Sequence, residues 1–175
     1  FEPYVPEYKD GKKTRVQYPM SSPRAQNFYK QFIPSLTAHL KEQQMGEIYA
    51  QHIADEPISS NIKSYVDIAR FIKQLAPEIK IIEACHSHDL ENTLDIWVPQ
   101  LNFYKDGYDF YRERQKQDDE VWFYTCLAPQ GDFANRFLEQ PLIKTRLIHW
   151  LNFKYGATGY LHWGFNQWFA NNDPY

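Results

Sequence analysis

Two spacings of apolar residues alternate along this chain, one typical of helices and the other of buried strands. Residues 23–45 carry an apolar side chain at every fourth position from Phe28 to Leu40, which predicts a helix. Ser22 followed by Pro23 is typical of a helix start. The first regular element predicted from these patterns is therefore a helix.

Further helices are predicted at three places. The first of these begins at a cap supplied by Ser59 or Ser60 and stops at Pro77. The second is a polar helix that follows the third strand and carries a tyrosine stripe along one side (Tyr104, Tyr108 and Tyr111). The last ends at Gly156, a residue suited to capping the carboxyl end of a helix.

Short, mostly apolar runs lie between these helices and read as strands. They cover residues 47–54, 79–85, 94–98, 121–126 and 159–164. Strands that alternate with helices form parallel sheets, and continuous apolar runs fit burial on both faces. A closed (β/α)8 barrel typically takes about 250 residues, so we expect an α/β fold that forms part of a TIM-like barrel, with its strands in sequential order.

The proline-rich start of the chain lacks a clear spacing of either kind. We expect residues 1–22 to be an extended loop segment. The whole chain, residues 1–175, is expected to be a single partial (β/α)-barrel domain, because its length suits one sizeable core.

Composition and charge narrow the class of partner. The formal net charge is -3 and both signs are well mixed, which argues against nucleic acid as a partner. No apolar run is long enough to span a membrane. Aromatic residues make up 17% of the chain, an excess that fits stacking against the flat apolar faces of a sugar ring as well as a tyrosine-rich core.

Cysteine and histidine usage points away from a disulfide framework or a cofactor. Cys85 and Cys126 both lie in apolar strand-like runs and are expected to be free thiols. His86 and His88 are spaced so that they could share a metal, but a third ligand is not identifiable, so neither a metal nor another cofactor is expected.

The clearest candidate for chemistry is Asp55-Glu56-Pro57, which ends the first predicted strand. Catalytic groups of parallel sheets lie beyond the carboxyl ends of the strands, and Pro57 disfavours a helical conformation at Glu56. Repulsion between neighbouring carboxylates favours a pair that keeps one proton, which suits acid-assisted cleavage of a glycosidic bond. A simple capping pair at a helix start is the alternative.

Other strand ends carry residues of the kind that line sugar sites. The candidate substrate-binding residues are Asp95, Trp97, Trp122, Tyr124, Trp163, Asn166 and Trp168. Each aromatic taken alone is more often a core residue, and it is their clustering near strand ends that favours a sugar site.

An ordinary retaining glycosidase needs a second carboxylate across the sugar from the acid. The fourth predicted strand ends in Thr125, Cys126 and Leu127 and offers none, so only Asp95 could serve. A substrate that supplies its own nucleophile would remove the need.

Several of these segments together resemble glycoside hydrolase family 123. They are residues 52–57, Trp122 to Cys126 with Pro129, Gly131 and 135–137, residues 141–147, Trp150, 154–156 and 159–164. The resemblance covers roughly residues 46–170, including the segment often described as a domain of unknown function at the end of such proteins. It implies the C-terminal part of the barrel, because the first strands of the longer family members have no counterpart here.

The resemblance also implies a function. A member of this family is expected to remove a 2-acetamido sugar of the β-N-acetylgalactosaminide type, with retention and by substrate assistance. Asp55 would orient the acetamido group, and Glu56 would act as acid and then base. Aromatics matching Trp163 and Trp168 would wall the sugar, and a periplasmic or extracellular location is favoured.

Two other readings of the sequence remain. The chain could be a non-catalytic carbohydrate-binding relative or an inactive fragment that keeps the aromatic rim, or a barrel glycosidase with Asp95 as its nucleophile. An unfinished barrel also predicts either self-association or packing against a separate N-terminal half of the barrel.

Overall fold

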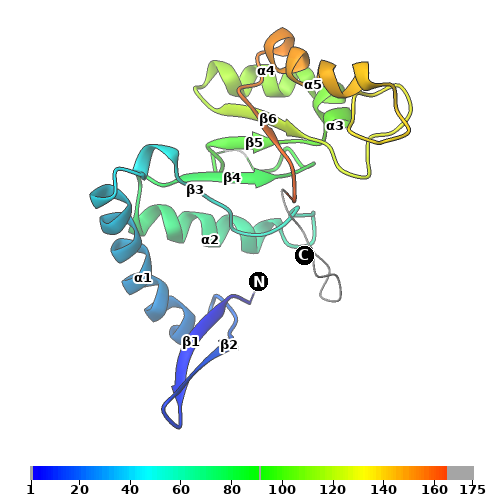
Figure 1. Cartoon of the computed structure of the whole chain (residues 1–175). Coiled ribbons are helices and arrows are strands. Elements are labelled where there is room, and N and C mark those ends of the chain that lie inside the picture. The colour runs from blue at the N-terminus through cyan, green and yellow to red at the C-terminus, as the bar shows by residue number, and fades with distance from the viewer. Residues whose placement is uncertain (1, 91, 165–175) are drawn as a thin grey trace. The chain divides into compact units, whose positions relative to one another are not determined.

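The computed structural model describes residues 2–90 and 92–164 (Figure 1). The chain divides into two compact units with a boundary between Ile96 and Trp97, and each unit is considered by itself.

Five strands form one sheet with the order β3-β4-β5-β6-β7. They are β3 (Ala50–Gln51), β4 (Lys80–Ala84), β5 (Ile96–Val98), β6 (Glu120–Tyr124) and β7 (Gly159–Leu161). The pairings β3–β4 and β6–β7 are parallel. The predicted strands and their sequential order are therefore confirmed, and the fold is α/β with strands alternating with helices, as in part of a TIM-like barrel.

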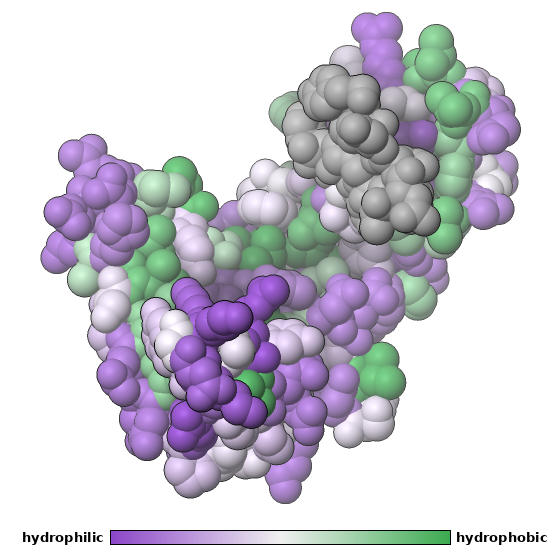
Figure 2. All heavy atoms as spheres, turned by 60° about the horizontal axis from the view of Figure 1, so that its bottom comes forward, coloured by the Kyte–Doolittle hydropathy of each residue, from purple (hydrophilic) through white to green (hydrophobic). Residues whose placement is uncertain are grey.

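The first unit opens with an antiparallel hairpin of β1 (Tyr4–Lys9) and β2 (Lys12–Gln17). This corrects the expectation of an extended loop over residues 1–22. Asp10 and Gly11 both have positive φ, 51° and 74°, which is the backbone that a two-residue hairpin turn requires. Figure 2, with the hairpin end turned toward the viewer, shows mainly hydrophilic side chains there.

Helix α1 (Pro23–Glu42) begins as predicted, because the Ser22 hydroxyl accepts a hydrogen bond from the Ala25 amide. A short 3₁₀ turn, η1 (Gly46–Ile48), then leads to β3. A small core joins α1 to the segment before β4, where Ile33 packs with Ala76 and Ile79.

Helix α2 (Ile62–Leu75) places four side chains in the core: Tyr65, Ile68, Ala69 and Ile72. The expected cap at Ser59 or Ser60 is wrong. Asn61 is the N-cap residue, and its side chain accepts from the Ile58 amide instead of capping the helix. The helix therefore starts after an additional turn, which lengthens the segment between β3 and α2.

The second unit contains α3 (Leu101–Asp106), α4 (Tyr108–Lys116) and α5 (Leu142–Tyr155). The predicted tyrosine helix is thus two short helices that join at Gly107. Tyr104 stacks on Phe123 of β6 with ring centres 6.0 Å apart, so aromatic pairs join the helices to the sheet. Gly156, with φ 71°, ends α5 as predicted.

Strands β6 and β7 pair Trp122 with Gly159. A Cβ atom placed on Gly159 would lie 2.2 Å from Cδ2 of the Trp122 ring. Glycine is therefore required for the indole to cover this strand.

Helix α5 also exposes a row of apolar side chains to solvent. Leu142, Ile143, Trp150 and Phe153 are all more than half exposed.

Candidate active site

Asp55 and Glu56 lie in the segment that links β3 to α2, past the carboxyl end of β3 at Gln51. Both side chains are exposed, whereas Ile53 and Pro57 on either side of the pair are buried. Glu56 has a positive φ of 43°, a conformation that costs a non-glycine residue of order 1–3 kcal/mol. Two buried apolar residues thus hold a strained turn that presents both carboxyl groups to solvent.

A fully buried carboxyl group lies beside this turn. Glu83, on β4, has no exposed surface, and its Oε1 atom lies 2.8 Å from Nε2 of His52. Its other oxygen accepts a hydrogen bond of 3.3 Å from the Ala54 amide. Glu83 therefore contacts the chain on the amino side of the Asp55-Glu56 pair at two points.

The charges around Glu83 shift two neighbouring groups. The Glu83 carboxylate beside Nε2 of His52 raises the pKa of His52 above its usual value; burial works against this rise, while the charge of Asp55 adds to it. Burial, followed by the charge of Glu83, raises the pKa of Tyr65 on α2 well above its ordinary range. His52 therefore holds its proton more tightly than a free imidazole does, and the phenol of Tyr65 on α2 stays neutral.

The loop after β4 brings a second imidazole to the pair. Nε2 of His86 lies 3.6 Å from Oε1 of Glu56, and both side chains are partly exposed. The carboxyl ends of β3 and β4 therefore bring Asp55, Glu56 and His86 together.

Asp95 lies at the opposite end of the strands. It precedes β5, and its backbone amide donates to the Ile81 carbonyl near the start of β4. One carboxylate oxygen accepts from the Ile81 amide at 2.7 Å, and Nζ of Lys73 lies within 3.0 Å of both oxygens. In this structure Asp95 ties α2 to β4 and does not join Asp55 and Glu56.

Trp97, another predicted sugar contact, is completely buried in the second unit. Its ring packs edge-to-face on Phe110, and its N–H donates to Asp119 at 2.8 Å. The guanidinium of Arg114, itself bonded to Asp119, lies over the same ring. The indole has no exposed face to offer a sugar.

At the carboxyl end of β6 the side chains are neutral. Tyr124 is 5% exposed and Thr125 is fully buried, with its hydroxyl 2.5 Å from that of Tyr160. The loop that follows is organised by the buried amide of Asn135, which donates to the carbonyls of Cys126 and Pro129. This end of the sheet supplies aromatic rings and hydroxyls.

Two of the four remaining predicted sugar contacts, Trp122 and Trp163, belong to the described residues. Trp122 is partly exposed, and its N–H donates to Glu120 at 3.3 Å. Trp163 is 61% exposed just past β7. Asn166 and Trp168 lie outside the described residues.

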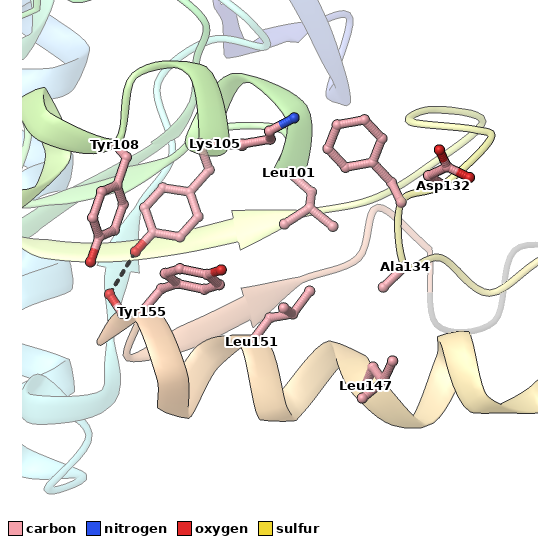
Figure 3. A pocket seen from close by; sticks show the side chains of 10 residues that line it. Leu101, Lys105, Tyr108, Asp132, Ala134, Leu147, Leu151 and Tyr155 are labelled. Atoms are coloured by element: carbon pink, nitrogen blue, oxygen red, sulfur yellow. Dashed lines mark hydrogen bonds between the residues drawn. The ribbon is translucent and has the colours of Figure 1, made fainter.

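An apolar cavity of about 410 Å³ lies between α3, α4, the loop after β6 and α5 (Figure 3). Leu101 and Lys105 face Leu147 and Leu151 across it, with Asp132 at one end. The hydroxyl of Tyr104 donates to the Tyr155 carbonyl at the other. Among the predicted site residues that the structure describes, none lines this cavity.

Over residues 2–90 and 92–164, no three His, Cys, Asp or Glu side chains gather closely enough to hold a metal ion. Neither Cys85 nor Cys126 forms a disulfide bond. None of the helices seen in this part of the chain has the length and apolar character needed to cross a bilayer.

The protein-family model described as the glycoside hydrolase 123 catalytic domain matches residues 2–175 of the chain. The chain belongs to glycoside hydrolase family 123. No curated protein matches the sequence.

A solved structure of a family 123 glycoside hydrolase from Clostridium perfringens, described in a study of glycolipid glycan hydrolysis, is similar to this chain with a TM-score of 0.70. The two are 19% identical, and the match covers 91% of this chain and 29% of the other. The chain thus has the fold of less than a third of that family 123 protein.

Sequence reasoning missed Glu83, gave His52 no role of its own and treated His86 only as a metal candidate. For Glu83 a signal was present, because it is the one acidic residue inside the apolar run IKIIEAC. A charged residue in a buried strand is costly unless it is paired, so it marks a polar contact that the fold has to supply. In this family 123 chain His52 and the Ala54 amide supply that contact.

Proposed function

We propose that this chain carries the catalytic carboxyl pair of a retaining glycoside hydrolase that removes a β-linked 2-acetamido sugar of the N-acetylgalactosamine type. The observation that supports this most is the placement of Asp55 and Glu56. Both are exposed on the turn past the carboxyl end of β3, where parallel-sheet enzymes hold their reactive groups.

The two carboxyl groups take different roles in this proposal. Glu56 protonates the leaving oxygen as the bond from the anomeric carbon to that oxygen breaks, and the acetamido oxygen of the substrate bonds to the same carbon. Asp55 holds the acetamido N–H and stabilises the positive charge of the resulting oxazolinium ion. Water then attacks the anomeric carbon and gives a proton to Glu56, while the bond from that carbon to the acetamido oxygen breaks and the acetamido group is restored. Holding the acetamido oxygen in place makes its attack intramolecular, which lowers the barrier by several kcal/mol.

The position of Asp95 supports the substrate's own oxygen as the nucleophile. A carboxylate nucleophile would have to face the acid across the sugar at about 5 Å. Asp95 instead lies on the amino side of β5, with its oxygens bonded to Lys73 and to the Ile81 amide.

The experiment uses substrates whose N-acyl group carries zero to three fluorines, assayed with active protein that contains this chain. Fluorine withdraws electrons from the attacking oxygen, so kcat should fall steeply and in order from acetyl to trifluoroacetyl. A flat series together with a trapped glycosyl–Asp95 adduct would overturn substrate assistance.

A non-catalytic carbohydrate-binding role is the second candidate, because the exposed ring of Trp163 past the end of β7 offers a face on which a sugar can stack. Turnover of a chromogenic N-acetylgalactosaminide, with no turnover of the matching galactoside, would separate the two. Binding of the acetamido sugar without turnover of either compound would favour the binding role.

A further inference from the structure

Glu83 combines features that ordinary packing does not explain. It is fully buried, it bears a carboxyl group, and it contacts the segment before Asp55 through both of its oxygens. Burying a carboxylate costs several kcal/mol that a partly exposed partner such as His52 offsets only in part. An apolar side chain of similar size would fill the site at no such cost.

The strained backbone at Glu56 explains why a contact between Glu83 and the preceding segment is needed. A non-glycine residue with φ 43° persists only when its surroundings fix the backbone on both sides. Pro57 is buried on the carboxyl side of Glu56. On the amino side, the Glu83 carboxyl bonds the Ala54 amide, one residue before Asp55.

We propose that Glu83 is a positioning residue for the reaction: from β4 it fixes His52 and the Ala54 amide and so sets where Asp55 and Glu56 stand. This inference rests on the proposed function of that pair. It assigns Glu83 no contact with the sugar, because the side chain has no exposed surface. We therefore expect replacement of Glu83 to change kcat, the turnover rate of bound substrate, more than it changes KM.

The test variant is Glu83→Gln, which keeps the shape and removes the charge. In active protein that contains this chain, kcat should fall about 10- to 100-fold, since a displacement of about 1 Å at the reacting groups costs on this order. KM should change less than about threefold. A kcat within threefold of wild type would overturn the proposal.

A matched control is Asp119→Asn, which removes a mostly buried carboxylate from an ion pair with Arg114 in the other unit. This variant should unfold more easily while kcat stays within about threefold. Equal losses of kcat in Glu83→Gln and Asp119→Asn, each in step with lost stability, would show a merely structural role and overturn the proposal.

Two readouts do not depend on turnover. The groups facing His52 are Glu83 from β4 and Asp55 on the turn, with Tyr65 from α2 facing Glu83. Exchange of the His52 C2 hydrogen, followed by mass spectrometry, should show a titration midpoint above about 6.5 that moves down in Glu83→Gln. Amide exchange over residues 54–56 should rise in Glu83→Gln and not in Asp119→Asn. Unchanged exchange at both places would overturn the proposal.

A double variant checks that Glu83 and His52 act as one unit. Glu83→Gln combined with His52→Gln should be no slower than Glu83→Gln alone, because the second change removes a contact that is already lost. Strictly additive losses would contradict the shared role. Loss of activity in Glu83→Gln, with full activity in Glu56→Gln, would reject the proposed acid and leave the anchoring of the turn by Glu83 standing.

Discussion

The turn after β3 and the loop after β6 follow the carboxyl ends of strands in different units, and different chemistry holds each in place. A buried carboxyl group, Glu83, anchors the turn with His52 as its partner. A buried neutral amide, Asn135, anchors the loop by donating to two backbone carbonyls and accepting from the Arg136 amide.

The difference separates two ways to hold a strand-end segment. An amide supplies donors and an acceptor without charge, so the loop needs no counterion and its stability is independent of protonation. A carboxyl group with an imidazole partner fixes the turn and also couples it to pH. The candidate catalytic pair, Asp55 and Glu56, lies on the turn, which is the segment held by a charged group.

The largest expected effect concerns the acid. Glu56→Gln should lower kcat about 10²- to 10⁴-fold, because the leaving oxygen loses its proton donor. Binding of the product should survive, since glutamine keeps the shape, and calorimetric titration with the sugar checks this. Activity within a few-fold of wild type would reject Glu56 as the acid.

The next effect concerns the aromatic pair that joins α3 to β6 in the second unit. Phe123 is fully buried against Tyr104, so Phe123→Ala should reduce the free energy of unfolding by about 3–5 kcal/mol. Phe153, 89% exposed on α5, is the matched control, and its change to alanine should stay within about 0.5 kcal/mol. Urea unfolding measures both, and equal effects would mean that the aromatic pairs do not hold this unit together.

Asn135→Ala should cost less, about 1–3 kcal/mol, because it leaves the carbonyls of Cys126 and Pro129 without their donor. The cost should be the same at every pH from about 5.5 to 8.5, as the amide does not titrate. Gln130→Ala, at an exposed position of the same loop, serves as the control. A pH-dependent cost would remove the contrast between loop and turn.

The smallest effect is the pH dependence of the turn. The folded pKa of His52 lies above its unfolded value of about 6.5, so its contribution to stability is complete below that pH and is lost as pH rises through the folded pKa. The free energy of unfolding of wild type should therefore decline on the alkaline side of about pH 6.5, and His52→Gln should flatten this decline. The half-exposed imidazole keeps the effect small. An identical slope in both proteins would show that His52 does not supply it.

Much of the fold follows from local patterns in the sequence. Apolar runs between helices predicted all five strands of the parallel sheet and their order. The hairpin was missed because Pro3 and Pro6 favoured a loop, although Asp10-Gly11 is typical of a hairpin turn. The positive φ values of these two residues fix that turn.

The candidate site was harder to predict because the sequence does not show which end or face a residue occupies. Asp95 was close to a predicted strand, but only the start of β5 at Ile96 puts it on the amino side. All three residues of β5 are buried, so alternation could not place Trp97. The partner of Glu83 lies 31 positions away at His52, and only the pairing of β3 with β4 brings them together.

Because the Trp122 ring packs closely on Gly159, substitutions at these two positions should be correlated. Any side chain at 159 would occupy space that the indole already fills, so a larger residue there becomes tolerable only after the ring at 122 has shrunk. Among relatives that diverge from this chain, the two positions should therefore vary as a pair, with glycine kept wherever tryptophan is kept. A library that randomises position 159 alone would therefore retain mainly glycine, and placing a larger residue there requires both codons to change at once.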